Sequence, residues 1–287
     1  MILPSEPVQH VPYKKVIEEL QAAYRDRRPW SLIRLGDGES AILGYPEFGH
    51  PSHYRNWMSN FFGPSSGEDT VYAPLKDDLE RAIRGADVVG TGGARLTDPE
   101  AGRELLLSLG AIAVRTAEQN AAQNAAERLF LNYHVSRLGD LRGIVTHANI
   151  HIHLEHAGVL ADLMSRSRSA TLIGCRNVAS ALREKFPDTS LQHIAVPGEY
   201  KFEGPDSRRL WSLKKPHFPI VYHDVRAKLK AGHFCELVLV GAGPCGKVYC
   251  EDVRAAGGFA LDVGSIMDLW AGVVTRSYMA NMKPTTI

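Results

Sequence analysis

Short apolar runs rich in β-branched residues recur along the chain, and stretches with helical spacing separate them. Such runs are typical of strands that are buried on both faces of a sheet. They lie at 31–35, 87–91, 111–115, 143–147, 170–174, 193–197, 236–241 and 258–263. Because each parallel pair of strands needs a crossover, this regular strand–helix alternation predicts a mostly parallel sheet with helices on both faces. The predicted fold class is therefore α/β, with ligands bound at the carboxyl ends of the strands.

The 287 residues are expected to form one domain, with its core at about 30–275. This length also allows two domains, but the sequence has no internal repeat, low-complexity tract or Gly/Ser-rich linker at which to divide it. The least regular stretch is 197–219, which mixes aromatic and charged residues with several prolines. We interpret it as a lid beside the site or a surface excursion. A plain connection followed by an amphipathic helix is the alternative.

Composition excludes several classes of protein. The chain has 33 Lys and Arg against 32 Asp and Glu, which argues against a protein that coats nucleic acid, although 208–215 holds a local group of basic side chains. The four cysteines form no C-x-x-C pair, which disfavours a disulfide framework or a cysteine-based zinc site. No apolar run reaches the ~18 residues of a membrane span, and the first residues lack a signal-peptide core, so we expect a cytoplasmic protein.

The first predicted strand runs into an acidic pair, Asp37 and Glu39, in the sequence SLIRLGDGES. Gly36 and Gly38 flank the pair and permit tight turning of the backbone, and Arg34 lies within the strand. Two carboxylates one residue apart at the end of a strand can converge on a hard divalent cation whose other ligands are phosphate oxygens and water. The alternative is an ordinary turn with Glu39 in the first turn of a helix, where its charge favours the dipole.

A glycine-rich loop follows the strand ELVLV near the other end of the chain. The pattern Gly241-x-Gly243-x-x-Gly246 precedes a predicted helix, and the next strand ends at Asp262, about 20 residues beyond the second glycine. Bare glycine backbone lets a diphosphate approach the helix N-terminus, and Lys247 adds a positive charge. Too few residues follow Asp262 for the rest of a dinucleotide-binding half. Diphosphate binding is therefore favoured over an NAD-dependent oxidoreductase, which stays as an alternative.

Histidines crowd a predicted strand-to-helix junction in the sequence THANIHIHLEH. The residues concerned are His147, His151, His153, Glu155 and His156. Because the segment contains no H-E-x-x-H motif and no complete three-ligand spacing, zinc is a minor alternative. A histidine with an ordinary pKa near ~6.5 suits proton transfer at neutral pH, so we take His147 as a candidate catalytic residue. Packed or solvated histidines are the other interpretation.

Two further loops that follow predicted strands carry an arginine. Gly92 and Arg95 lie in GTGGARLTD, and Arg176 lies in GCRN. Each loop is a candidate wall of a phosphate or sugar pocket, and a turn with an exposed arginine is the alternative. The aromatic residues of WMSNFF, at 57–62, are interpreted as core or lid packing because no basic stripe accompanies them.

Together, strand-R-L-G-D-G-E near the N-terminus and strand-G-A-G-P-C-G-K with A-L-D-V-G-S near the C-terminus resemble the bacterial glycosyltransferases with the GT-D type fold. In that family, first described as a domain of unknown function, a Rossmann-like sheet binds a nucleoside-diphosphate sugar. An Asp-x-Glu motif works there with a divalent metal. The resemblance places the metal ligands at Asp37 and Glu39 and implies Mn²⁺ or Mg²⁺. Relatives tend to carry a histidine directly after the glycine that corresponds to Gly264, where this chain has Ser265.

The resemblance implies a glycosyltransferase that moves a sugar from a nucleoside-diphosphate sugar, a UDP-sugar first of all, to an acceptor hydroxyl of a glycan or glycoconjugate. Candidate catalytic residues are Asp37, Glu39 and His147. Candidate donor-binding residues are Arg34, Gly36, Gly38, Gly92, Arg95, Arg176, Gly241, Gly243, Pro244, Lys247, Asp262 and Ser265. The acidic pair favours this function over hydride transfer, which needs no such pair. A non-catalytic nucleotide-sugar-binding module is the other alternative, and a homo-oligomer is left open.

Overall fold

The computed structural model of the chain describes residues 10–45, 51–63, 73–92, 131, 134–135, 137–199, 215–276 and 279–287. Outside the described residues lie the predicted strand at 111–115, Arg95, and most of 197–219, including its basic group except for Lys215. The side chain of Asp37 also lies outside them.

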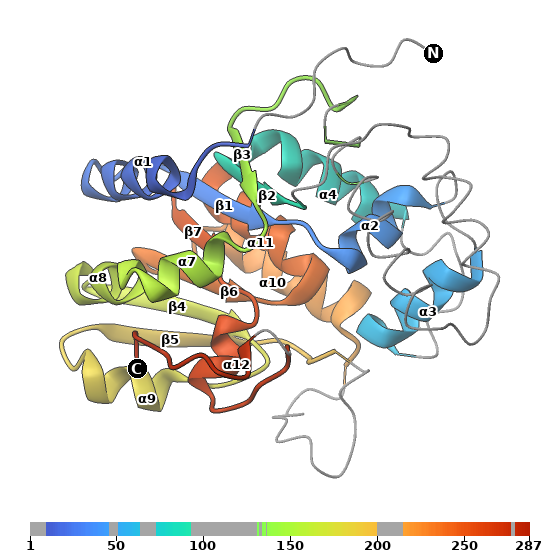
Figure 1. The fold of residues 1–287 in the computed structure, drawn as a ribbon. Coiled ribbons are helices and arrows are strands. Elements are labelled where there is room, and N and C mark those ends of the chain that lie inside the picture. The colour runs from blue at the N-terminus through green and yellow to red at the C-terminus, as the bar shows by residue number, and fades with distance from the viewer. Residues whose placement is uncertain are drawn as a thin grey trace.

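Seven parallel strands form one sheet in the described part of the chain, in the order β3-β2-β1-β7-β6-β4-β5 (Figure 1). The strands are β1 (Trp30–Arg34), β2 (Val88–Thr91), β3 (Ile144–His147), β4 (Ser169–Gly174), β5 (Ser190–Ala195), β6 (Leu237–Gly241) and β7 (Phe259–Asp262). This confirms the predicted α/β fold with a parallel sheet. Its order places β1 and β7, which are far apart in the sequence, side by side at the centre.

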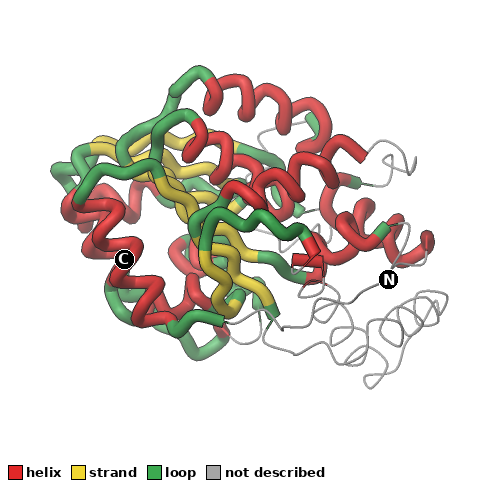
Figure 2. The backbone as a smooth tube through the Cα atoms, turned by 90° about the horizontal axis from the view of Figure 1, so that it is seen from above, coloured by secondary structure: helices red, strands yellow, loops and turns green. Residues whose placement is uncertain are grey.

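Helices cover both faces of the sheet, as predicted, and Figure 2 shows the strands as a twisted band between them. One face carries α2 (Asp37–Gly44), α3 (Pro51–Phe62), α4 (Ala73–Gly85), α10 (Tyr222–Lys230) and α11 (Gly243–Ala255). The other carries α1 (Tyr13–Arg25), α7 (Ile150–His156), α8 (Val159–Arg166), α9 (Ala179–Lys185) and α12 (Ile266–Trp270). None of these helices combines the length and the apolar character that crossing a membrane requires.

The apolar runs follow directly from burial on two sides. In β1, Leu32 packs into the core under α1 and α8, whereas its neighbour Ile33 packs into the opposite core under α4 and α11. Successive strand side chains point to opposite faces, so a strand covered on both sides is mostly apolar along its whole length. Helix α4 shows the complementary pattern, because Leu75 and Leu79 are buried one turn apart.

The connections that leave β1 and β7 diverge at the carboxyl end of the sheet. Helix α2, which follows β1, packs on one face, and α12, which follows β7, packs on the other. Neighbouring strands whose connections leave to opposite faces open a crevice between them, and ligands of open α/β sheets bind in such crevices. The fold therefore prepares a site between the turn after β1 and the turn after β7.

Candidate active site

A cavity of about 470 Å³ lies at the carboxyl ends of β1, β6 and β7. Its volume is within the range of pockets that hold small molecules and cofactors. The sequence-predicted residues that line it are Arg34, Gly36, Gly38, Glu39, Gly92, His147, Arg176, Gly241, Gly243, Pro244, Lys247 and Ser265. Asp262 lies just beneath them, in contact with Arg34 and Lys247. The sheet thus brings both predicted motifs to one cavity.

Glycines let neighbouring groups pack closely around this cavity. A Cβ atom on Gly38 would lie 2.4 Å from the Phe61 ring, and one on Gly241 would lie 3.0 Å from the Gly264 carbonyl oxygen. Gly243 has φ of +54°, a conformation that side chains rarely tolerate, and it begins α11, with Pro244 in the first turn. The N-terminal N–H groups of α11 therefore begin at the cavity wall, where an anion would be favoured.

Lys247 joins the two motifs. Its Nζ atom lies 2.9 Å from Glu39 Oε1, 3.1 Å from Asp262 Oδ2 and 3.1 Å from the Gly243 carbonyl oxygen. All three side chains are buried, with exposed fractions of 7%, 7% and 2% for Lys247, Glu39 and Asp262. Burial alone lowers the pKa of Lys247, but the Asp262 and Glu39 carboxylates outweigh it and raise that pKa. The amine is therefore a buried ammonium.

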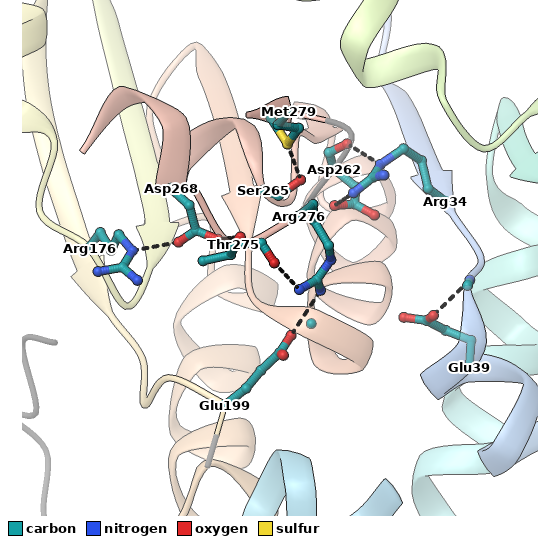
Figure 3. A network of polar contacts seen from close by, with 12 residues as sticks. Arg34, Glu39, Arg176, Glu199, Asp262, Ser265, Asp268, Thr275, Arg276 and Met279 are labelled. Carbon is teal, nitrogen blue, oxygen red and sulfur yellow. Dashed lines mark hydrogen bonds and ion pairs between the residues drawn. The ribbon is translucent and has the colours of Figure 1, made fainter. Parts of the chain in front are cut away.

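Arg34 binds the same residue, Asp262, as Figure 3 shows. Its Nε donates to the Asp262 carbonyl oxygen at 3.0 Å, and its Nη2 lies 3.3 Å from Asp262 Oδ1. Burial raises the pKa of Asp262, but Arg34 and Lys247 more than offset this and hold that pKa below its ordinary value. Asp262 is thus an ionised carboxylate that fixes two cations at the cavity.

His151 contacts the guanidinium of Arg34. Its ring nitrogens lie 3.0 and 3.2 Å from Arg34 Nη1, and the side chain is buried. Burial first, and the Arg34 charge second, lower the pKa of His151 well below its ordinary value. A neutral imidazole has a nitrogen that accepts from the guanidinium, so His151 orients Arg34. The spacing of the histidines in the sequence carries no signal for this role.

Two further ion pairs, shown in Figure 3, line the cavity and were not predicted. Arg176 Nε lies 2.5 Å from Asp268 Oδ1, whose other oxygen accepts from the Thr275 hydroxyl at 2.7 Å. Arg276 Nη2 lies 3.9 Å from Glu199 Oε1. Asp268 lies on α12, one turn after Ser265, and that spacing is the one local signal that links it to the predicted loop.

In the described part of the cavity, positively and negatively charged side chains are equal in number. The cations are Arg34, Arg176, Lys247 and Arg276, and the carboxylates are Glu39, Glu199, Asp262 and Asp268. Each of these cations lies within 4 Å of at least one of the carboxylates. An incoming diphosphate would therefore be compensated by the α11 N-terminus, by rearranged ion pairs or by a cation that enters with it.

Aromatic residues form one wall. Trp57 and Phe61 stack with centroids 5.5 Å apart, and both line the cavity together with Phe62. Phe61 and Phe62 also belong to the buried core, which agrees with the packing role predicted for 57–62. His217 lies beside them and its Nε2 is 2.9 Å from the Tyr249 hydroxyl oxygen. Burial lowers the pKa of His217 to about 3.

The residues of the histidine-rich segment lie in different environments in the structure. His147 lines the cavity, and its Nδ1 accepts from the Asn149 backbone N–H at 3.2 Å. His153 stacks on Tyr13 outside the cavity. Glu155 is fully buried and binds the segment at Thr285 and Thr286. Among side chains that the structure describes, no group of three or more His, Cys, Asp or Glu could hold a metal ion.

A family model for the GT-D fold-like domain matches residues 11–204, which is more than half of the chain. The chain belongs to the GT-D-like family. The match includes β1, the acidic turn after it and Arg176, and it confirms the family suggested by the sequence motifs. The glycine-rich loop at 241–247 lies beyond the matched residues.

Solved structures share the GT-D-like fold at low identity. Two structures of the domain of unknown function 1792, one of them a selenomethionine form, are each 16% identical to this chain, with a TM-score of 0.50, and cover 97% of it and 87% of their own chain. One is described as having a distinct glycosyltransferase fold. A glycosyltransferase of this type from Streptococcus sanguinis is 14% identical, with a TM-score of 0.49, over 97% and 90%. No curated protein matches the sequence.

Proposed function

We propose that this GT-D-like protein is a glycosyltransferase that moves a sugar from a nucleoside-diphosphate sugar to a hydroxyl of a glycan or glycoconjugate. A UDP-sugar is the first donor to test. The observation that supports this most directly is the meeting of the two motifs: Lys247, from the glycine-rich loop and helix after β6, lies 2.9 Å from Glu39, in the acidic turn after β1. Family membership supports the same reaction class.

In this proposal the diphosphate binds at the start of α11. The bare backbone at Gly243 would let phosphate oxygens approach, and the first N–H groups of the helix would donate to them. Arg34 and Lys247 lie next to that position and would stabilise the charge that develops as the bond to the diphosphate breaks. Ser265 also lines the cavity and is proposed as a further donor contact.

Asp37 and Glu39 are proposed to hold Mn²⁺ or Mg²⁺. The chemistry of these ligands fits, because hard divalent cations prefer carboxylate oxygens. Both Glu39 oxygens are already engaged, one with Lys247 and one with the Gly36 N–H at 2.8 Å, but each oxygen has a second lone pair. A bound divalent ion would act as a Lewis acid toward the diphosphate leaving group.

The acceptor hydroxyl must lose its proton as its oxygen bonds to the anomeric carbon. His147 Nδ1 accepts from a backbone N–H, so in the neutral ring its Nε2 carries the proton and suits donation to a substrate oxygen. We therefore assign His147 a substrate-contacting role and assign the base to Glu199. Glu199 lines the cavity, and its Oε1 lies 3.8 Å from where a Cβ atom on Gly243 would be, beside the proposed diphosphate position.

A thermal-shift panel tests the donor class. UDP, GDP, CMP, their common sugars and NAD(H) are each added with and without Mn²⁺ to the wild-type chain. A ligand that binds only the folded state stabilises it by about 2.7 kcal/mol at a hundredfold excess over Kd. We expect a Mn²⁺-dependent shift with one nucleotide sugar, and a shift with NAD(H) alone would instead indicate the oxidoreductase.

Turnover separates a transferase from a binding module. Release of the nucleoside diphosphate from the donor found in the panel should be detectable with the wild-type chain, and Glu39→Gln should abolish it. Glu19→Gln, the same change at an exposed position of α1, is the matched control and should leave it unchanged. Donor binding by the wild-type chain without any turnover would contradict the proposal.

A further inference from the structure

The ammonium of Lys247 occupies a cation site made by two segments of the chain. Glu39 comes from the first turn of α2, and Asp262 is the last residue of β7. Both place a carboxylate oxygen within 3.1 Å of the same nitrogen, and the Gly243 carbonyl oxygen is a third neighbour. Nζ donates to the Gly243 carbonyl oxygen, and the two carboxylates set two negative charges beside its positive charge. The chain therefore fills this position with its own charge.

This arrangement opposes a second cation. Glu39 and Asp262 carry two negative charges, and Lys247 and Arg34 supply two positive charges that lie within 3.3 Å of them. A divalent ion on Glu39 would lie close to the buried ammonium, and like charges repel strongly where water is excluded. A donor diphosphate brings the negative charge that would offset this repulsion.

We propose that Lys247 keeps a divalent cation off Glu39 until a nucleoside diphosphate occupies the cavity, so that metal and donor bind together. The inference rests on the proposed function in that it takes Glu39 as a metal ligand and a nucleoside diphosphate as the donor. Coupling between two ligands is reciprocal, so the metal raises donor affinity by the same factor by which the donor raises metal affinity. Lys247 is then the residue that couples metal entry to donor entry.

Mn²⁺ alone is the probe, and the unbound ion is counted by electron paramagnetic resonance in titrations of the full chain without nucleotide. Lys247→Met removes the charge and keeps most of the side-chain volume, and it should bind Mn²⁺ at least about tenfold more tightly than the wild-type chain. Lys247→Arg keeps the charge and should resemble wild type. Adding Glu39→Gln to Lys247→Met should abolish the gain.

The proposal is overturned if wild type binds Mn²⁺ as tightly as Lys247→Met, if neither binds it, or if Lys247→Arg gains as much as Lys247→Met. Circular dichroism shows whether each variant folds. If Lys247→Met does not fold, the coupling is tested on the wild-type chain. UDP and Mn²⁺ added together should raise the melting temperature by more than the sum of their separate shifts. Additive shifts would refute the coupling.

These outcomes are distinguishable from failure of the proposed function. If no nucleotide sugar binds but Lys247→Met gains Mn²⁺ affinity, the function is wrong and the competition between Lys247 and the metal holds. If sugar transfer occurs while all the variants bind Mn²⁺ equally, the function holds and the inference is wrong.

Discussion

Replacing Glu155, which binds the segment at 285–287, should lower the free energy of unfolding by an amount that depends on the new side chain. Glu155 Oε1 accepts from the backbone N–H groups of Thr285 and Thr286 at 2.7 and 2.9 Å and from Trp270 Nε1 at 3.3 Å. Its Oε2 accepts from the Thr286 hydroxyl at 2.5 Å. The carboxylate is fully buried, so four donors rely on it.

Glutamine and leucine at this position should give different costs. In Glu155→Gln the amide oxygen keeps the three N–H donors, and the amide nitrogen donates to the Thr286 hydroxyl, which rotates to accept. What is lost is the ionic part of these bonds, about 1–2 kcal/mol. Glu155→Leu leaves the donors unsatisfied, at roughly 1–3 kcal/mol for each one that stays buried, so we expect a cost of about 4 kcal/mol or more.

Urea unfolding, with thermal melting beside it, measures both costs. For a chain of this size each kcal/mol corresponds to roughly 2–4 °C, so Glu155→Leu should melt at least about 8 °C below wild type. Glu184→Gln is the control, because that glutamate is exposed on α9 and should change neither quantity. A cost for Glu155→Leu below about 1 kcal/mol, or equal costs for Gln and Leu, would refute the reasoning.

Two further predictions concern the cavity wall. Gly38→Ala places a Cβ atom 2.4 Å from the Phe61 ring, so the ring should shift into the cavity. Binding of the donor nucleotide should weaken at least tenfold, with little loss of stability. Calorimetric titration with that nucleotide checks this, and unchanged affinity would contradict it. The pKa of His217 is lowered to about 3, so between pH 6.5 and that value the unfolded chain takes up a proton that the folded chain does not, and stability present above pH 6.5 is lost as the pH falls. From pH 6.5 to 5 the loss in the free energy of unfolding is about 2 kcal/mol. Urea unfolding at pH 7 and pH 5 should show that His217→Phe loses about that much less of its free energy of unfolding than wild type does. Equal losses would show that His217 is not the cause.

The strands were predictable because burial on both faces makes a parallel strand mostly apolar. The residues after β1 and β6 stood out because glycines and charged side chains follow a buried strand there, although Glu39 also accepts from the Gly36 N–H at the start of α2. Glu199, Asp268 and Arg276 carried no comparable signal. Glu199 and Arg276 reach the cavity through the path of the chain after β5 and after α12, and Asp268 lies on α12 itself, where only its spacing from Ser265 links it to the predicted loop.

The histidine-rich segment shows the limit of spacing arguments. Helix α7 begins at Ile150, which places His151 and Glu155 on one buried face, four residues apart. The two side chains nevertheless act in different places, since His151 contacts Arg34 and Glu155 contacts Thr285 and Thr286. The contacts of each side chain depend on which segment packs against its turn of the helix, and this packing is set by the tertiary structure.

The pairing of β1 with β7 has a consequence for how the protein is made. β1 is synthesised before its neighbour at Phe259–Asp262, which follows more than two hundred residues later. Until then β3-β2-β1 and β6-β4-β5 are two separate half-sheets, each with an open apolar edge of the kind that invites aggregation. A chain that stops before β7 would leave the two half-sheets unjoined and would lack Asp262, so we expect incomplete translation products to be inactive and prone to aggregate.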